Sequence, residues 1–333
     1  MKIGLHYSLQ VAPGERSADV MRDTLDDIAW ADRHGFSAAL FAEHHFMADC
    51  WIPQPMQMAA AAAAITTRMR IGTDICVLPL HHPVEVAEQA AVLDNLSGGR
   101  AVLGVGLGWA RNEYEGFGVP FPSRGAVYER SITLVKRLLA GECVDSEDGH
   151  YRFKGALIRP LPVNPDGVPL WIAAVRDVAL PRVARLGDSW VMWPGADIAE
   201  LARQKRIVTD TRAAAGLPSM KEQLLRREAF VVETDAEVWR IFADGIRHEY
   251  GHVYRTLHPN YPADDSLDNL QKWGAGMFAI GSPQTVAALF KRYRDELGVT
   301  EVLVRCQLPT VPRGAVRDCL EGFREVMAIL ARG

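Results

Sequence analysis

The chain alternates between short, continuously apolar runs and longer segments in which apolar residues recur every three or four positions. The short runs are typical of strands buried on both faces, as in parallel sheets, and the longer segments are typical of amphipathic helices. Eight parallel strands that alternate with helices predict one (β/α)8 barrel, a TIM-barrel α/β fold, over residues 1–333. The eight runs lie at residues 2–8, 37–43, 69–78, 100–106, 169–174, 188–193, 226–232 and 300–306.

Two stretches interrupt this alternation. Residues 141–167 precede the fifth predicted strand and indicate a hairpin, and residues 251–275 form a polar, proline-containing insertion between strands seven and eight. A long irregular segment in a compact domain is usually functional or disordered. We therefore expect residues 251–275 to act as a mobile lid, with a surface insertion that has no role in function as the alternative.

Composition and charge narrow the class of partner. With 48% hydrophobic and 23% charged residues and a net charge of −4, the chain lacks the basic field that nucleic acids or anionic membranes attract. No apolar run reaches the roughly 20 residues of a membrane span, and the N-terminus lacks a signal-peptide layout, so we expect a cytoplasmic protein. The five cysteines are scattered singly, which fits neither a zinc ribbon nor a disulfide framework.

Titratable side chains follow the ends of predicted strands, where TIM barrels place their active sites. The sequence FAEHHF brings Glu43, His44 and His45 directly after strand two, and His81 and His82 follow strand three. Adjacent residues on a strand point to opposite faces, and the H-x-H spacing that lets ligands converge is absent, so we predict no metal ligands. Loop residues could still converge, which leaves a metal-dependent barrel hydrolase as an alternative.

Strand four ends in GVGLGW, with glycines at 104, 106 and 108. This spacing is tighter than the G-x-G-x-x-G dinucleotide fingerprint. Alternating glycines clear one face of a strand, which allows either a flat ring system to lie there or the neighbouring strand to pack closely.

Several segments together resemble the bacterial luciferase-like flavin-dependent monooxygenase family. They are EHHF, the block from Gly72 to Trp109, PLWIAA, and RLGDSW at residues 185–190. The resemblance implies a barrel that binds reduced FMN (FMNH2), or in some branches the deazaflavin coenzyme F420, at its C-terminal mouth. It implies oxygenation of a small organic substrate with O2 through a C4a-peroxyflavin, with F420-dependent hydride transfer or a non-catalytic flavin-binding homologue as alternatives. A separate NAD(P)H flavin reductase would supply the reduced flavin, unless the enzyme reduces its own.

The same resemblance assigns roles to individual residues. His44 is the expected catalytic acid/base near the flavin C4a position, while His45 points away and hydrogen-bonds within the protein. Asp74 and Ile75 match a cis peptide beneath the ring. The residues expected to contact the cofactor are Glu43, His44, Asp74, Ile75, Gly106, Leu107, Gly108, Trp109, Asn112, Ala174, Val175 and Arg176.

The phosphate end of the cofactor has two candidate partners. Arg176 could make a charge-assisted contact at a helix start, or it could instead pair with Asp177 on the surface. The second candidate is Arg226 or Arg227, of which only one can face the barrel interior.

Two further features of the sequence suggest a lining for the substrate site and a contact surface for another helix. Aromatic and methionine residues at strand ends favour an apolar or planar substrate, or pack between barrel and loops: Met47, Trp51, Trp109, Met192 and Trp193. The alanine run Ala59–Ala64 gives a helix with a smooth face, which is either buried in the monomer or approached by another helix. The family pairs its subunits through this region, so the resemblance implies a homodimer.

Overall fold

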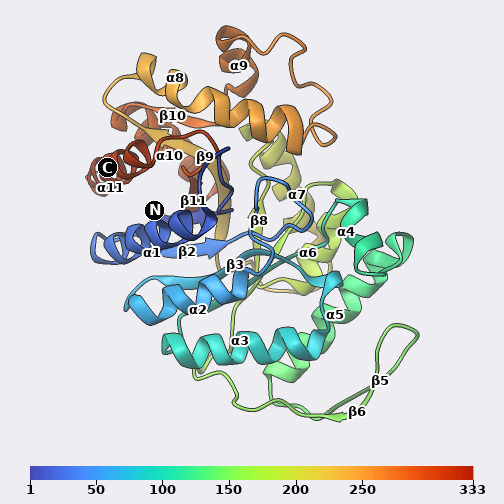
Figure 1. Cartoon of the computed structure of the whole chain (residues 1–333). Coiled ribbons are helices and arrows are strands. Elements are labelled where there is room, and N and C mark those ends of the chain that lie inside the picture. The colour runs from blue at the N-terminus through green and yellow to red at the C-terminus, as the bar shows by residue number, and fades with distance from the viewer. Residues whose placement is uncertain (333) are drawn as a thin grey trace.

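The computed structural model describes residues 1–332, and a closed barrel of eight parallel strands lies at its centre (Figure 1). The strands follow one another around the barrel in the order β1-β2-β3-β4-β7-β8-β9-β11, and β11 pairs again with β1. The predicted TIM barrel and its eight strands are therefore confirmed. Their bounds are β1 Lys2–Tyr7, β2 Ala38–Phe41, β3 Arg70–Val77, β4 Ala101–Gly106, β7 Leu170–Ala173, β8 Ser189–Met192, β9 Gln223–Val231 and β11 Glu301–Arg305.

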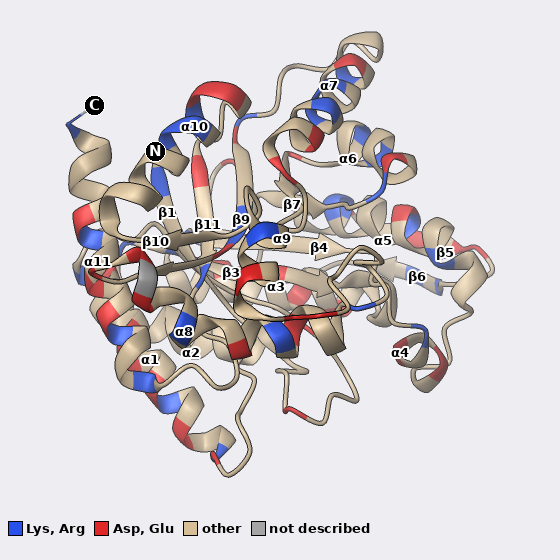
Figure 2. Cartoon of the chain, turned by 90° about the horizontal axis from the view of Figure 1, so that it is seen from above, with Lys and Arg blue, Asp and Glu red and all other residues tan. Residues whose placement is uncertain are grey.

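Helices surround the strands and carry many of the charged side chains at the surface. Figure 2 shows Lys and Arg interspersed with Asp and Glu along α1, α7, α10 and α11, so neither sign dominates this face. No helix within residues 1–332 has both the length and the apolar character that a membrane crossing requires. The helices are α1 Ser17–Arg33, α2 Pro55–Ile65, α3 Pro83–Ser97, α4 Arg111–Gly116, α5 Arg124–Leu139, α6 Leu180–Leu186, α7 Ile198–Ala214, α8 Asp235–Ile246, α9 Leu267–Gly274, α10 Pro283–Leu297 and α11 Arg313–Ala331.

Local sequence explains where several helices begin and end. Helix α3 begins at Pro83, whose missing N–H is not needed in the first turn. It ends at Ser97 and is followed by Gly98, which has a left-handed φ of 69°. Helix α10 also begins at a proline, and the Ser282 side chain accepts a hydrogen bond from the backbone N–H of Thr285.

Both predicted insertions are present. The first is an antiparallel hairpin of β5 (Val144–Glu147) and β6 (Arg152–Ala156), and in Figure 1 it lies on the opposite side of the molecule from α8 and α9. The second is more ordered than a loop, because it overlaps a π-helix at Arg247–Val253 and contains α9. A short strand that the sequence did not reveal, β10 (Ala279–Gly281), follows the second insertion and extends the pairing of β9.

Strands β3 and β4 approach each other closely at glycines. The pairing register shifts between Thr73 and Cys76, and the intervening Asp74–Ile75 peptide is cis, as the family resemblance implied. A Cβ on Gly104 would lie 2.1 Å from the Thr73 carbonyl oxygen, and the Ile75 side chain fills the space beside Gly106. The alternating glycines therefore accommodate the neighbouring strand.

Replacing Gly72 with alanine should strongly destabilise the barrel. The added Cβ would lie 1.8 Å from the Val102 carbonyl oxygen, and this backbone contact cannot relax by a change of rotamer. We expect a loss of about 3 kcal/mol or more in the free energy of unfolding, measured by urea denaturation. Gly314→Ala on α11 is the control, because nothing lies within 4 Å of its added Cβ. An equal, small effect of both substitutions would contradict the predicted strand contact.

Candidate active site

The two histidines of the EHH sequence after β2 contact the carboxyl groups of two different glutamates. His44 Nδ1 lies 2.7 Å from Glu113 Oε1, and His45 Nε2 lies 2.7 Å from Glu43 Oε1. The backbone N–H of His45 also donates to Glu113 Oε1, at 2.8 Å. His45 therefore hydrogen-bonds within the protein, as predicted, and both histidines are held by buried carboxyl groups.

Glu113 is the residue of this site that the sequence did not reveal. It lies on α4, is fully buried, and is next to the predicted cofactor contact Asn112, which is exposed. Because a carboxylate only accepts hydrogen bonds, the proton between Glu113 and His44 belongs to His44 Nδ1. With the shared proton on Nδ1, the His44 ring presents the lone pair of Nε2, which suits a general base.

Glu43 connects the ends of β2 and β3 through hydrogen bonds. Its carboxylate accepts hydrogen bonds from His45 Nε2, from His81 Nε2 at 2.6 Å and from the backbone N–H of Val77 at 2.9 Å. Burial alone would raise the pKa of Glu43, but the two imidazoles and the backbone N–H lower it to about 2. Glu43 is therefore an anion that positions the strand ends.

The residues predicted to contact the cofactor lie on one continuous part of the barrel rim. They lie in or after β2, β3, β4 and β7, which are consecutive neighbours in the sheet. Asp74 is buried and its Oδ2 lies 3.1 Å from His6 Nδ1, while burial lowers the pKa of His6 to about 4. Leu107, Gly108 and Trp109 are partly exposed; Ala174 is buried, and Val175 and Arg176 are exposed at the start of a short 3₁₀-helix before α6.

Among the candidate phosphate ligands, Arg227 is excluded by its contacts. Its guanidinium is fully buried and donates to the carbonyl oxygens of Trp193, Pro194 and Ala196 and to the Tyr293 hydroxyl. Of the two neighbours, Arg227 is therefore the one that does not face the barrel interior, and backbone carbonyls already occupy its donors.

Arg226 and Arg176 have different surroundings. The buried Arg226 side chain pairs with Glu228 at 2.6 Å, while its neighbour Arg227 contacts α10, as strand alternation requires. Arg203 donates to both carboxylate oxygens of Asp177 at 2.7 Å, so the alternative of a surface pair between Arg176 and Asp177 is wrong. Arg176 is exposed beside a helix start and stays the candidate for the phosphate.

Aromatic rings close over His44. The ring centroid of His44 lies 4.6 Å from Trp51 and 5.7 Å from Trp109, and Tyr254 of the second insertion lies 6.4 Å away. Tyr254 also lies within 6.0 Å of Trp51, Trp109 and Trp193. The insertion therefore contributes a buried ring to the mouth. Met47 is partly buried, whereas Met192 is fully buried in the core.

A buried charge network joins this insertion to the barrel. Glu249 of the π-helix accepts a hydrogen bond from Arg305 of β11 at 2.7 Å, and both side chains are fully buried. Arg305 also donates to Ser8 at 2.8 Å and lies 3.6 Å from Glu228. Residues from β9, β11 and the loop after β1 therefore hold the base of the insertion in place.

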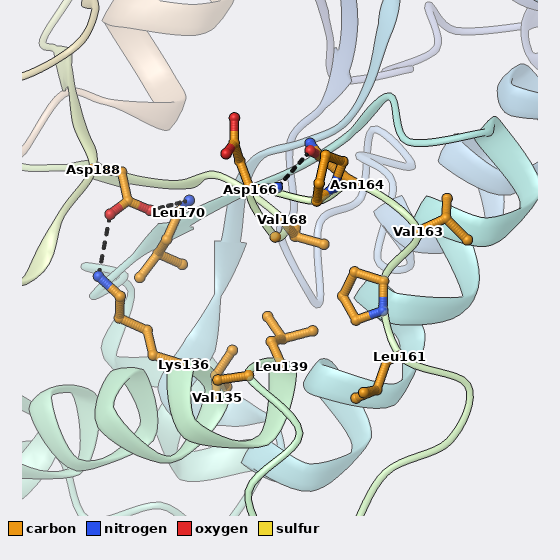
Figure 3. Close-up of a pocket in the computed structure, with 14 residues that line it drawn as sticks. Val135, Lys136, Leu139, Leu161, Val163, Asn164, Asp166, Val168, Leu170 and Asp188 are labelled. Atoms are coloured by element: carbon orange, nitrogen blue, oxygen red, sulfur yellow. Dashed lines mark hydrogen bonds and ion pairs between the residues drawn. The ribbon is translucent and has the colours of Figure 1, made fainter.

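A groove elsewhere on the surface contains none of these residues. It has a volume of about 510 Å³ and lies between α5 and the segment before β7 (Figure 3). Leu170 and Asp188, which line it, mark the beginnings of β7 and β8, so the groove lies at the end of the barrel opposite the mouth. TIM-barrel active sites lie at the other end, so this groove is not the catalytic site.

Comparison with known proteins supports the family resemblance seen in the sequence and the barrel seen in the structure. Residues 1–301 match the family model for luciferase-like monooxygenases. The chain belongs to this family. Luciferase-like monooxygenases are oxidoreductases, so the hydrolase alternative is wrong.

Individual relatives and neighbours have more specific names. Limonene 1,2-monooxygenase of Rhodococcus erythropolis is 26% identical over 82% of this chain and 72% of its own length. Several other curated relatives are matched over only about half of their length. Three solved structures share the fold over at least 98% of this chain. Monooxygenase RslO1 of Streptomyces bottropensis is 23% identical, with 99% of that chain covered and a TM-score of 0.84. The oxygenating constituent of 3,6-diketocamphane monooxygenase of Pseudomonas putida, in complex with FMN, is 17% identical, with 98% of that chain covered and a TM-score of 0.82. An F420-dependent secondary alcohol dehydrogenase is 19% identical, with 98% of that chain covered and a TM-score of 0.79.

Proposed function

We propose that this luciferase-like protein is a flavin-dependent monooxygenase that uses reduced FMN and O2 to oxygenate a small organic substrate. The observation that carries this proposal is His44, hydrogen-bonded to the buried Glu113 beneath an aromatic mouth. Bound reduced FMN would supply oxygen activation at C4a. The protein's part is to bind, orient and shield the reactants and to move a proton at His44 Nε2.

The site residues fit such a group. Trp109 Nε1 and Glu113 Oε2 are buried and have no hydrogen-bond partner within residues 1–332, so a donor and an acceptor are available beside His44. Leu107 to Trp109 would lie along the ring, and the backbone after Ala174 together with Arg176 would hold the phosphate. Glu113 would stabilise the His44 imidazolium that forms when Nε2 takes a proton.

FMN is favoured over F420 by the EHHF sequence and by two similar proteins. The diketocamphane monooxygenase structure contains FMN, and limonene 1,2-monooxygenase is named for an oxygenation. The F420-dependent alcohol dehydrogenase has the same fold, so hydride transfer without oxygen is the second candidate.

Labelled oxygen separates the two functions. The protein would be incubated with ¹⁸O2, a flavin reductase that supplies FMNH2, and a panel of cyclic terpenes and ketones, and products would be analysed by mass spectrometry. The monooxygenase proposal expects one ¹⁸O atom in the product. Unlabelled products that form only with F420 would contradict it.

The second insertion, residues 251–275, would act as a lid over the substrate. Tyr254 supports this role, because its ring contacts the aromatic residues around His44 from outside the barrel. A substrate next to His44 would need the space near this ring.

Attachment of the insertion should weaken as pH rises. His248 Nε2 lies 2.8 Å from Asp49 Oδ2, and this hydrogen bond raises the pKa of His248 above 6.5, with Glu249 adding to the effect and Arg305 opposing it. A raised folded-state pKa gives stability that is present below pH 6.5 and lost as pH rises through the folded value. Hydrogen exchange in residues 247–258 should therefore be faster at pH 8.5 than at pH 6, beyond the intrinsic effect of pH.

The matched variants are His248→Gln and His252→Gln. The first should remove the excess pH dependence, and the second, whose ring lies 6.2 Å from His248, should retain it. Identical pH profiles for wild type and His248→Gln would contradict the prediction.

A homodimer would form through α2 and α3. These helices pack side by side and expose Ile65, Val92 and Leu96, which are 45%, 52% and 49% accessible. Such an apolar surface suits a second copy of the chain. Val92→Glu should convert the dimer to a folded monomer in sedimentation velocity, with Val178→Glu, on another exposed segment, as the control. A wild-type monomer would contradict the proposal.

A further inference from the structure

Three metal-ligating side chains converge at the ends of β2 and β3. A carboxylate oxygen of Glu43, the Sγ of Cys76 and a ring nitrogen of His81 all lie within 4.8 Å of one another. Glu43 and Cys76 are buried, and the His81 side chain is 16% accessible, which gives a path from solvent. The three residues come from separate positions in the sequence, so no spacing motif announces the cluster.

We propose that Glu43, Cys76 and His81 form a binding site for Zn²⁺ or a similar borderline-soft divalent cation. Carboxylate oxygen, thiolate sulfur and imidazole nitrogen are all zinc ligands, and a thiolate selects against Mg²⁺ and Ca²⁺. A water molecule would complete a four-coordinate site. This inference concerns cation binding alone and does not depend on the proposed oxygenation.

The charges of the cluster favour a dication. A carboxylate and a thiolate together neutralise Zn²⁺, so the loaded site buries no net charge. The cation would displace the proton of the Cys76 thiol, and the ring proton of His81 would lie on Nδ1, so that Nε2 is free to bind the metal. His45 Nε2, 2.7 Å from the same Glu43 oxygen, would remain a hydrogen-bond donor that orients the carboxylate.

The geometry requires only a small adjustment. Zn–N and Zn–O bonds are about 2.0–2.2 Å, so two ligands in a tetrahedral site lie roughly 3.3 Å apart. The distance from His81 Nε2 to Glu43 Oε1 is 2.6 Å, and His81 follows the short 3₁₀-helix Leu78–Leu80 in a partly exposed position where its ring can move. A cation would then cross-link the ends of β2 and β3 next to the chain segment that holds His44.

Cobalt and zinc titrations of the metal-free protein test this site. Protein treated with chelator should bind one Zn²⁺ per chain by calorimetry, and one Co²⁺ should produce a near-ultraviolet thiolate-to-metal absorption band. Cys76→Ser should abolish the band, and both Cys76→Ser and His81→Gln should weaken Zn²⁺ binding about tenfold or more. Zn²⁺ should raise the melting temperature of the wild type and not that of Cys76→Ser.

Control variants distinguish the loss of a specific Zn²⁺ site from a general effect of replacing a cysteine or a histidine. Cys50→Ser and His82→Gln change an exposed cysteine and an exposed histidine nearby in the sequence and should bind like the wild type. His81→Gln keeps an N–H donor for Glu43, so its fold should persist, as checked by near-ultraviolet circular dichroism. No thiolate band, or equal Zn²⁺ affinity in wild type and Cys76→Ser, would show that the cluster is a hydrogen-bond network only.

Discussion

Replacing His44 with asparagine should lower the rate of product formation about 10²- to 10⁴-fold, the range typical of a lost general acid/base. Asparagine can still donate to Glu113, so the hydrogen bond at 2.7 Å can be replaced while proton transfer at Nε2 is lost. The affinity for reduced FMN should change little. The measurement is turnover with the substrate identified by the labelled-oxygen assay, together with hydrogen peroxide release, which should rise as oxygenation fails.

Two comparison variants make this result specific. Glu113→Gln removes the negative charge that stabilises a protonated His44, so it should lower turnover less than His44→Asn and shift the pH dependence of turnover. His82→Asn alters an exposed histidine at the start of α3 and should act like the wild type. Turnover of His44→Asn within a factor of about three of wild type would contradict the assigned role of His44.

Replacing Arg305 with methionine should cost about 3–5 kcal/mol in the free energy of unfolding, because it leaves the buried Glu249 carboxylate without its cationic partner. Arg305 is fully buried, contacts Glu249 at 2.7 Å, and lies 3.6 Å from Glu228, which is also fully buried. Urea denaturation followed by circular dichroism gives the value. Hydrogen exchange should also increase in the π-helix Arg247–Val253, which carries Glu249.

A surface pair provides the control for this substitution. Arg324 and Glu321 lie 2.9 Å apart, but their side chains are 52% and 48% accessible, so Arg324→Met should change stability by less than about 1 kcal/mol. Equal small effects of the two substitutions would mean that the interior network adds no more than a surface ion pair.

The barrel could be predicted from the sequence because its strands are buried on both faces and read as continuous apolar runs. Strand β10 escaped this reasoning because it has only three residues, too few to show a pattern. The second insertion was predicted to be irregular, yet Tyr254 and Tyr261 within it and Tyr250 directly before it are buried. Their spacing of four and seven residues is typical of one face of a helix, and this was the feature of the sequence that could have indicated order.

The site could be predicted only where chain order corresponds to position around the rim. His44 and the residues after β3, β4 and β7 follow from strand order, and strand alternation required Arg226 and Arg227 to face opposite sides. Partners far apart in the sequence could not be predicted in this way. Glu113, which lies 69 residues from His44, and the convergence of Glu43, Cys76 and His81 depend on how helices and loops pack against the rim.

Cofactor selection tests the central claim most directly. Purified protein would be titrated without oxygen, first with reduced FMN and separately with reduced F420, and then mixed rapidly with oxygen while the absorbance spectrum is recorded. We predict tight binding of reduced FMN and a C4a-peroxyflavin spectrum whose decay rate changes in His44→Asn. Tight binding of reduced F420 alone, with no reaction toward oxygen, would contradict the monooxygenase assignment and leave a hydride-transfer enzyme on the same barrel.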